Sequence, residues 1–434
     1  MTDHHDPRWT LMHIFICAMQ NVWADTIDKA AEEILDALKE KIDTTRSISS
    51  RDNVFYFDGW DGLGESAVLR AIAQRHTATS PDGKRALAEM EFDQVMHIDC
   101  SLWESRRALQ RVVAQKLELP DEVMKILDRQ DEEDDFLGVA HGSRVEVQQV
   151  VREMQQHIQK MDRRFLVVFH NGSSEEIDLA SCCGLPLSGF STSKVLWTFQ
   201  GRFRLKPRVK VDMALQSMGT SDVFISVAPY SREQEELWPY LVLQEAEEVI
   251  ADCSINAGPS GRLAEVAECF LYLLDLGCRG HHSIDYDLAT HSSNYWVCDY
   301  IIQRRQQGGR DISDDHDDGS LWTAAEAMRF GMTLDVDCHQ YRPPSSHFAR
   351  SRVESKPHWT SPTYGCFIIS TGTITDGDMF QHFNRLSVLK LSCCAFNFQS
   401  PPFLCCHNLR FLWLDHCQGI GTSTDRAGRE EEVS

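Results

Sequence analysis

A glycine-rich turn after residue 57 has the residue types and spacing to bind phosphate. The stretch FYFDGWDGLGESAVLRAIAQ fits the phosphate-loop pattern G-x-x-x-x-G-K-[ST], except that Glu65 stands where the pattern has lysine. The backbone part of such a site survives, because amides at the start of a helix and a serine hydroxyl still favour an anion. The candidate residues are Gly59, Gly62, Gly64, Glu65, Ser66 and Ala67.

The exchange of lysine for glutamate reverses the charge nearest a bound phosphate. Two unit charges about 4 Å apart interact by about 4 kcal/mol at an effective dielectric constant near 20. Since about 1.4 kcal/mol is tenfold in affinity, a quarter of the combined change already costs more than tenfold. We therefore expect weak binding of ADP or ATP, less weakened if Glu65 turns toward solvent, or a turn kept only for packing.

Strand-like runs alternate with amphipathic helical segments through the first half of the chain. The run NVFYF precedes the glycine turn, and helical spacing resumes at residues 67–74. Further apolar runs occupy residues 95–98, 165–169, 194–198 and 222–227, and helical segments occupy 106–117 and 145–157. This alternation predicts an α/β domain whose parallel sheet is covered on both faces.

Other segments are assigned from their own patterns. Residues 23–42 have the spacing of one amphipathic helix. The acidic stretch DEVMKILDRQDEEDD at 121–135 predicts a solvated linker or exposed turn rather than a metal site. Beyond residue 230 we expect helices at 239–251, with Pro239 in the first turn, and at 263–276, and a core-facing segment at 292–302.

A leucine pattern repeats once near the end of the chain. The pattern L-x-x-L-x-L-x-x-[NC] is matched by Leu386, Leu389, Leu391 and Cys394. It recurs 23 residues later at Leu409, Leu412, Leu414 and Cys417. Because about three or more repeats are needed to bury a continuous core, two matches predict a short repeat stub.

Composition indicates which kinds of partner and which cellular location to expect. The formal net charge of −22 disfavours nucleic acid, and the short basic stretch at residues 202–210 is expected to be a solvated surface. Fifteen irregularly spaced cysteines in a long chain without a recognisable signal peptide favour reduced thiols and a cytoplasmic location. The apolar stretch at 11–19 is about half the ~20 residues of a membrane span, so no transmembrane segment is predicted.

The order of these elements resembles plant nucleotide-binding leucine-rich-repeat immune receptors, the NLR or NB-ARC proteins, and in particular a divergent cereal group. The resemblance spans roughly residues 50–417. Besides the glycine turn, it rests on FDQVMHIDCSLWESRRALQRVVAQKLELP (92–120), FLVVFHN (165–171), SKVLWTFQ (193–200) and the segment 267–302, which is similar to a winged-helix motif.

The resemblance assigns roles to three more residues, each of which departs from the family pattern. His170 and Asn171 stand at the Walker B strand end, where the family has two aspartates for Mg²⁺. Gln200 replaces the arginine expected to sense the γ-phosphate. The family's Met-His-Asp triplet is missing, and the GLPL at 184–187 precedes the strand that it follows in the family, so we interpret it as a coincidence. We therefore predict no metal and no useful ATPase activity.

The resemblance also implies a domain organisation and a role. It implies a helical segment at 1–50, a P-loop NTPase-like (NB) domain at 51–232, an ARC-type helical and winged-helix region at 233–372, truncated leucine-rich repeats at 373–418 and a polar tail at 419–434. The implied role is plant defence signalling through contacts with other proteins, in an oligomeric state that is not predicted.

Three alternatives remain open at this point. The first is an active P-loop ATPase whose cation comes from Arg70, Lys194 or Arg202. The others are a pure repeat-mediated interaction protein, which would show a large exposed apolar patch on the repeats, and a non-functional truncated receptor.

Two further groups of residues are weaker candidates for a catalytic or metal site. His97 and Cys100 lie near a strand end, where a base and a nucleophile could meet, although their spacing also fits packing. Zinc sites could begin at Cys278, His281 and His282 or at Cys338 and His339, but neither set has a second pair at ligand spacing.

Overall fold

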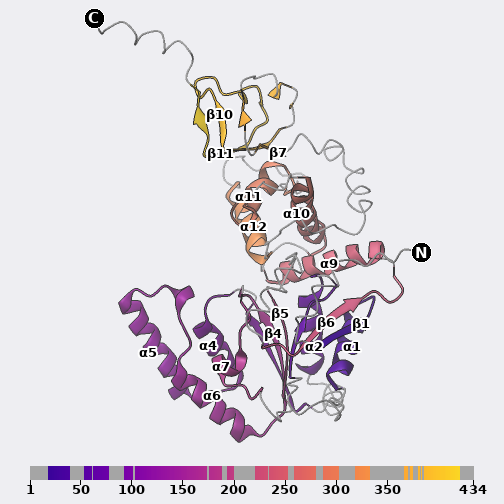
Figure 1. Ribbon diagram of the computed structural model, residues 1–434, viewed down its shortest axis with the longest axis vertical. Helices are drawn as coiled ribbons and strands as arrows, with labels where there is room; N and C mark the ends of the chain where they lie inside the picture. The colour runs from indigo at the N-terminus through magenta and orange to yellow at the C-terminus, as the bar shows by residue number, and fades with distance from the viewer. Residues whose placement is uncertain are drawn as a thin grey trace, which may run out of the picture. The chain divides into compact units, whose positions relative to one another are not determined.

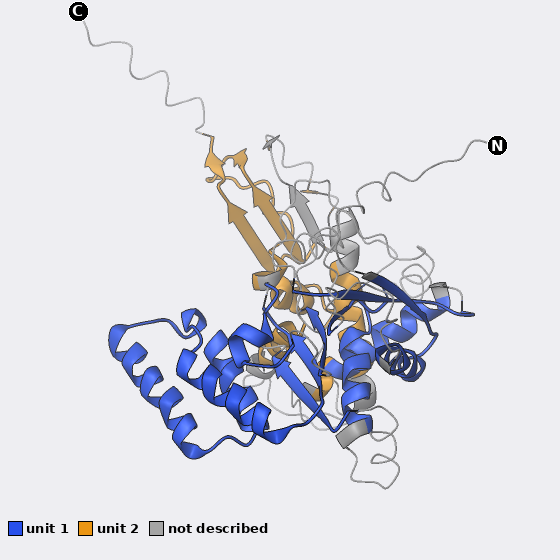
Figure 2. Cartoon of the chain, turned by 60° about the horizontal axis from the view of Figure 1, so that its bottom comes forward, with its two compact units in different colours: residues 1–248 blue, residues 249–434 orange. Residues whose placement is uncertain are grey.

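The structure is a computed structural model. It describes residues 18–39, 53–60, 62–77, 92–100, 103–173, 175–187, 193–199, 220–232, 234–252, 259–279, 287–302, 318–332, 366–369, 372–374, 380–381, 383 and 386–420. The chain forms two compact units, which divide after Glu248 (Figure 2).

The first unit is built on a six-stranded sheet in the order β1-β6-β2-β5-β4-β3. Its strands are β1 (Ala18–Trp23), β2 (Val54–Phe57), β3 (Gln94–Cys100), β4 (Phe165–Asn171), β5 (Lys194–Phe199) and β6 (Val223–Ala228). Every neighbouring pair runs parallel, so all six carboxyl ends lie at one edge. The predicted α/β fold with a parallel sheet is confirmed.

The N-terminal segment differs from the prediction of one helix over residues 23–42. Residues 18–23 form the edge strand β1, which pairs with β6 from Ala18↔Val223 to Trp23↔Ala228. Helix α1 (Ile27–Lys39) begins only after this strand. The strand escapes a search for apolar runs because Gln20 and Asn21 interrupt it, as an edge strand with an exposed face allows.

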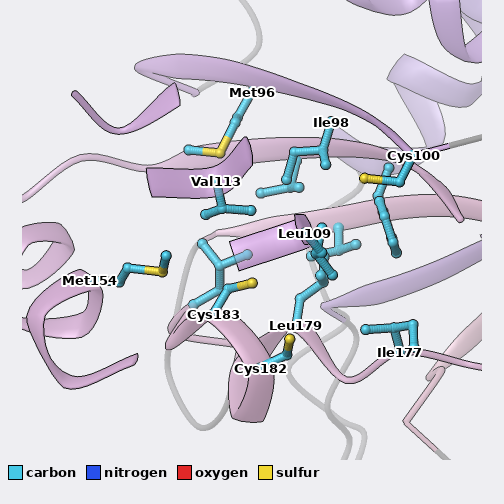
Figure 3. Packing of buried hydrophobic residues seen from close by; sticks show 14 of the residues in the cluster. Met96, Ile98, Cys100, Leu109, Val113, Met154, Ile177, Leu179, Cys182 and Cys183 are labelled. Carbon is cyan, nitrogen blue, oxygen red and sulfur yellow. The ribbon is translucent and has the colours of Figure 1, made fainter. Parts of the chain in front are cut away.

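Helices cover both faces of the sheet (Figure 1). Helix α2 (Glu65–Thr77) follows β2 and packs with α1 on one face. The helices α4 (Arg106–Lys116), α6 (Gln148–Met161) and α7 (Leu179–Cys183) cover the other face. In the core of that face, side chains of β3 meet side chains of the three helices; Figure 3 labels Met96, Ile98, Cys100, Leu109, Val113, Met154, Leu179, Cys182 and Cys183 among them.

The acidic stretch at 121–135 is helical, so the prediction of a linker was wrong. Helix α5 (Asp121–Leu137) buries Val123 and Leu127, one turn apart, and ends at Gly138 in the left-handed conformation. Many of its acidic side chains are exposed, but some bind arginines of α4: Asp131 accepts hydrogen bonds from Arg107 and Arg111 at 3.0 and 2.7 Å. Burial raises the pKa of Asp131, but these two bonds bring it below its ordinary value.

Helix α9 (Gln234–Asp252) begins before its predicted start, so Pro239 lies inside the helix rather than in its first turn. The second unit contains α10 (Pro259–Arg279), α11 (Leu288–Cys298) and α12 (Asp318–Gly331), of which α12 was not predicted. The segment 292–302 faces the core as expected, and the buried Trp296 donates its indole N–H to the carbonyl of Cys269 at 3.0 Å.

The C-terminal part of the second unit carries two small parallel sheets in the orders β11-β9-β7 and β12-β10-β8. The strands are β7 (Cys366–Ile369), β8 (Gly372–Thr373), β9 (Val388–Ser392), β10 (Cys394–Phe396), β11 (Phe411–Asp415) and β12 (Gln418–Gly419). The two leucine matches fall on β9 and β11, with Leu389 opposite Leu412 and Leu391 opposite Leu414.

Candidate functional site

The glycine turn joins β2, an inner strand of the sheet, to the start of α2. In open α/β sheets, ligands bind outside the carboxyl ends of the strands, where successive connections leave on opposite faces. The turn lies at that edge of the sheet, because it follows the carboxyl end of β2, which has β6 on one side and β5 on the other. The turn therefore occupies the position in the sheet where a phosphate ligand is expected.

The backbone of this turn folds tightly on itself. Gly59, Gly62 and Gly64 all have positive φ angles, of 59°, 89° and 79°. The amide of Gly62 donates to the carbonyl of Asp58 at 3.0 Å, and the amide of Trp60 donates to the carbonyl of Leu63 at 2.9 Å. Glycine is required at these positions because side chains rarely adopt this left-handed geometry.

One amide of the turn is already bound to a carboxylate of the chain. The amide of Gly64 donates to Oε1 of Glu245 in α9, at 2.7 Å, and the Glu245 side chain is fully buried. A carboxylate oxygen is the same kind of acceptor as a phosphate oxygen, so this amide already has a charged acceptor within the chain. No local sequence pattern indicates this contact, because the two residues are 181 positions apart.

Large side chains fill the space beside the same glycine. A Cβ added at Gly64 would lie 2.9 Å from two ring atoms of Trp60 and 3.2 Å from a methyl carbon of Leu241. Trp60 is buried and fixed, since its indole N–H donates to the carbonyl of Ala24 at 3.0 Å. The turn is thus packed against Trp60 and helix α9.

Glu65 faces inward. Its side chain is fully buried, and a Cβ at Gly59 would come within 2.8 Å of its Cγ, so Glu65 lies against the turn and does not extend into solvent. The next residues, Ser66 and Ala67, are buried as well. Asp58, Glu65 and Glu245 therefore place three buried carboxyl side chains around one short turn.

The residues at the Walker B position are fully buried but offer no carboxylate. His170 lies beside the turn, with its Nδ1 3.4 Å from the hydroxyl oxygen of Ser66. Asn171 instead orders the loop after β4: its side-chain amide donates to the carbonyl of Glu175 at 2.7 Å, and its oxygen accepts from the amide of Ser173 at 2.9 Å. The structure thus brings His170 to the turn and gives Asn171 a local role.

Of the cations proposed for an ATPase, Arg70 and Lys194 are engaged by other groups. Arg70 binds Glu248 and Asp99, at 2.9 and 3.5 Å. Lys194 is the first residue of β5, at the edge of the sheet opposite the turn, and donates to the carbonyl of Leu38. Gln200 and Arg202 lie outside the described residues.

His97 and Cys100 do not form a nucleophile and base. Residues three apart on a strand point to opposite faces, so Cys100 lies in the core with α4 and α7. His97 instead meets the ring of His170, at 5.1 Å between centroids. Burial raises the pKa of the Cys100 thiol to about 12, which keeps it protonated, and burial lowers the pKa of His97 below 6.5.

The predictions about metal sites, a membrane span and the basic stretch can be compared with the structure only in part. Within the described ranges, no three His, Cys, Asp or Glu side chains gather as a metal site, and no helix is long and apolar enough to cross a membrane. Residues 202–210 and the histidines of both zinc candidates lie outside those ranges.

Comparison with known proteins adds no relative. No protein-family model, curated protein or solved structure matches this chain. Function is therefore inferred from the geometry of the turn and from the resemblance of the motifs.

Proposed function

We propose that this chain is a nucleotide-independent scaffold with the architecture of a P-loop NTPase, acting through contacts with other proteins. The observation that carries the proposal is the hydrogen bond from the Gly64 amide to the buried carboxylate of Glu245. A chain that supplies its own anion to the turn needs no nucleotide to satisfy that amide.

A nucleotide phosphate would have to displace Glu245. A hydrogen bond to a charged group contributes about 1.5–3 kcal/mol, so breaking it costs about ten- to a hundredfold in affinity. The phosphate would also meet the inward-facing Glu65 and would have to move Trp60, whose ring contacts Gly64. We infer that ADP and ATP bind weakly or not at all, and that hydrolysis is absent.

The biological setting follows from the resemblance to NLR proteins. We infer a role in plant defence signalling in which packing and exchange of protein partners replace nucleotide exchange, in the cytoplasm. The helices α10 to α12 stand where the resemblance places the ARC and winged-helix region, and β9 and β11 carry the leucine pattern in parallel register. These features support the finer domain assignment as part of the proposal.

Nucleotide analysis of the purified protein tests the proposal. We expect the wild type to release no stoichiometric ADP or ATP on denaturation. The double variant Glu65→Lys with Glu245→Ala supplies a cation and removes the internal carboxylate, so it should retain more nucleotide than the wild type.

A matched control keeps the internal carboxylate. In the variant Glu65→Lys with Glu236→Ala, the alanine replaces an exposed glutamate of the same helix, and the protein should remain nearly empty. Stoichiometric ADP in the wild type would refute the proposal and reopen the ATPase alternative.

A further inference from the structure

The two leucine repeats bring a pair of cysteines together. Cys394 and Cys417 hold the same position in the repeated pattern, 23 residues apart. The paired residues on either side of them keep this offset, with Ser392↔Asp415 before them and Ala395↔Gln418 after them. Cys394 therefore lies directly opposite Cys417 of the neighbouring repeat.

Both thiols belong to the interior of the repeats. Cys394 is fully buried in the core of this region, and Cys417, which is partly exposed, packs against the same core. The thiol of Cys394 donates to the carbonyl of Ser392, and the thiol of Cys417 donates to the carbonyl of Leu391, each at 3.2 Å. Burial raises the pKa of Cys394, and the neighbouring thiol of Cys417 acts in the same direction. The two sulfurs are thus close enough to influence each other's ionisation.

The spacing of the two residues fits a disulfide bond. Neighbouring strands lie about 4.7–4.9 Å apart, and side chains opposite each other on paired strands project from the same face of the sheet. Disulfide-bonded cysteines have Cα atoms about 4.4–6.8 Å apart. The backbone of the repeats therefore holds these two reduced thiols at a distance that a disulfide can bridge.

We propose that Cys394 and Cys417 form a reversible oxidation site, at which hydrogen peroxide converts the two thiols into a disulfide bond between successive repeats. The sulfur of Cys417 attacks the peroxide: an S–O bond forms, the O–O bond breaks, and the leaving oxygen takes up the thiol proton to become water. The sulfur of Cys394 then attacks this sulfenic acid: the S–S bond forms, the S–O bond breaks, and the second proton leaves in a second water. The two sulfurs lose two electrons in total, and the peroxide gains them.

The exposure of the two residues sets the order of these steps. Peroxide reaches the partly exposed Cys417, whereas Cys394 is buried and meets only its neighbours in the core. Disulfides in reducing compartments are usually transient and redox-sensing, so the site agrees with a chain whose cysteines are otherwise reduced. Because stacked repeats are stabilised by contacts with their neighbours, the bond fixes one repeat on the next.

Peptide mapping of the full chain tests the proposal. The protein is treated with hydrogen peroxide, quenched with catalase, alkylated with N-ethylmaleimide and digested with trypsin without reductant. Cleavage after Lys390, Arg410 and Arg426 places Cys417 alone in residues 411–426, and Cys394 in residues 391–410. We expect mass spectrometry to find these two peptides joined by a disulfide to Cys394, and dithiothreitol to separate them.

Substitutions identify the two sulfurs. Cys394→Ser and Cys417→Ser should each abolish the joined peptides, with circular dichroism showing that the fold is kept. The matched controls are Cys393→Ser and Cys405→Ser, which change exposed cysteines of the same tryptic peptide and should leave the joined peptides unchanged. Non-reducing electrophoresis should show the oxidised protein as a single chain, which places the bond within one molecule.

Three outcomes in the wild type, which need no substitution, would overturn the proposal. They are a disulfide confined to residues 391–410, a bond from Cys417 to any cysteine other than Cys394, and no disulfide at a peroxide concentration that oxidises the exposed Cys405. None of these measurements involves the turn at Gly64, so this proposal and the nucleotide-independent function can fail separately.

Discussion

The amide of Gly64 and the carboxylate of Glu245 are joined by a 2.7 Å hydrogen bond between residues 181 positions apart. Two neighbouring contacts of the same helix strengthen this connection. Leu241, one turn before Glu245, packs against Gly64, and Glu248, about one turn after it, binds Arg70 of α2 at 2.9 Å. One face of α9 thus holds the turn and the helix that follows it.

Removing the Glu245 carboxylate should destabilise the fold. The variant Glu245→Ala leaves the buried Gly64 amide without its acceptor, which costs about 1–3 kcal/mol in the free energy of unfolding. Glu245→Gln retains an amide oxygen that can accept the bond, so it should cost less. Urea denaturation measures both, with the exposed Glu236→Ala as control. Equal stability of the alanine variant and the wild type would show that the bond contributes nothing.

Gly64 should tolerate no side chain. In Gly64→Ala the new Cβ would come within 2.9 Å of Trp60, in addition to the strain of a φ angle of 79°. Gly138 has a similar φ of 73° with no atom within 4 Å of an added Cβ, so Gly138→Ala reports the backbone strain alone, about 1–2 kcal/mol. We expect thermal unfolding to show a larger loss for Gly64→Ala. A smaller loss than for Gly138→Ala would contradict the close packing of Trp60.

The two arginines of α4 that bind α5 should differ in their contribution to stability. Arg107 is buried, 4% exposed, and binds both Asp131 and Asp134, whereas Arg111 is 29% exposed. Because removal of this buried guanidinium leaves the 13% exposed carboxylate of Asp134 without its charge, Arg107→Ala should cost about 2–4 kcal/mol. Arg111→Ala should cost about 1 kcal/mol or less. Chemical denaturation would contradict this if the order were reversed.

His97 should make the fold sensitive to mild acid. Burial lowers the pKa of His97 below 6.5. The negative charge of Asp99 acts to raise this pKa, and the positive charges of Arg70 and Lys116 act to lower it further. The unfolded chain therefore takes up a proton near pH 6.5 that the folded chain does not, so stability is complete above that pH and is lost as the pH falls toward the folded pKa. The slope for one proton is at most about 1.4 kcal/mol per pH unit.

A substitution at His97 isolates this effect. Unfolding free energies measured between about pH 7 and 5 should depend less on pH in His97→Gln than in the wild type. The exposed His141→Gln is the control for replacing a histidine in the same unit. An unchanged slope in His97→Gln would assign the sensitivity to another group.

The sequence predicted the sheet because its strands are short apolar runs separated by helical segments. It missed β1, whose polar residues suit a half-exposed edge. It also missed helix α5, whose acidic residues are largely exposed but include Asp131 and Asp134, which bind arginines of α4. Arg107 and Arg111 lie on a separate helix, and local composition does not reveal such a pairing.

The candidate site was predictable only in its local part. The glycine spacing and the strand before it identified the turn, and the charge of Glu65 indicated a weakened phosphate site. The contact with Glu245 depends on how α9 packs against the sheet, which no pattern within the turn determines. Trp60 lies within the turn, but its packing depends on the hydrogen bond from its indole N–H to the carbonyl of Ala24 and on its close contact with Gly64.

Isothermal titration of the purified chain with ADP and with Mg·ATP tests the central claim most directly. Because Glu245 already binds the Gly64 amide and Glu65 faces inward, we predict no binding at micromolar nucleotide concentration. Micromolar or tighter binding of either nucleotide by the wild-type protein would contradict this account.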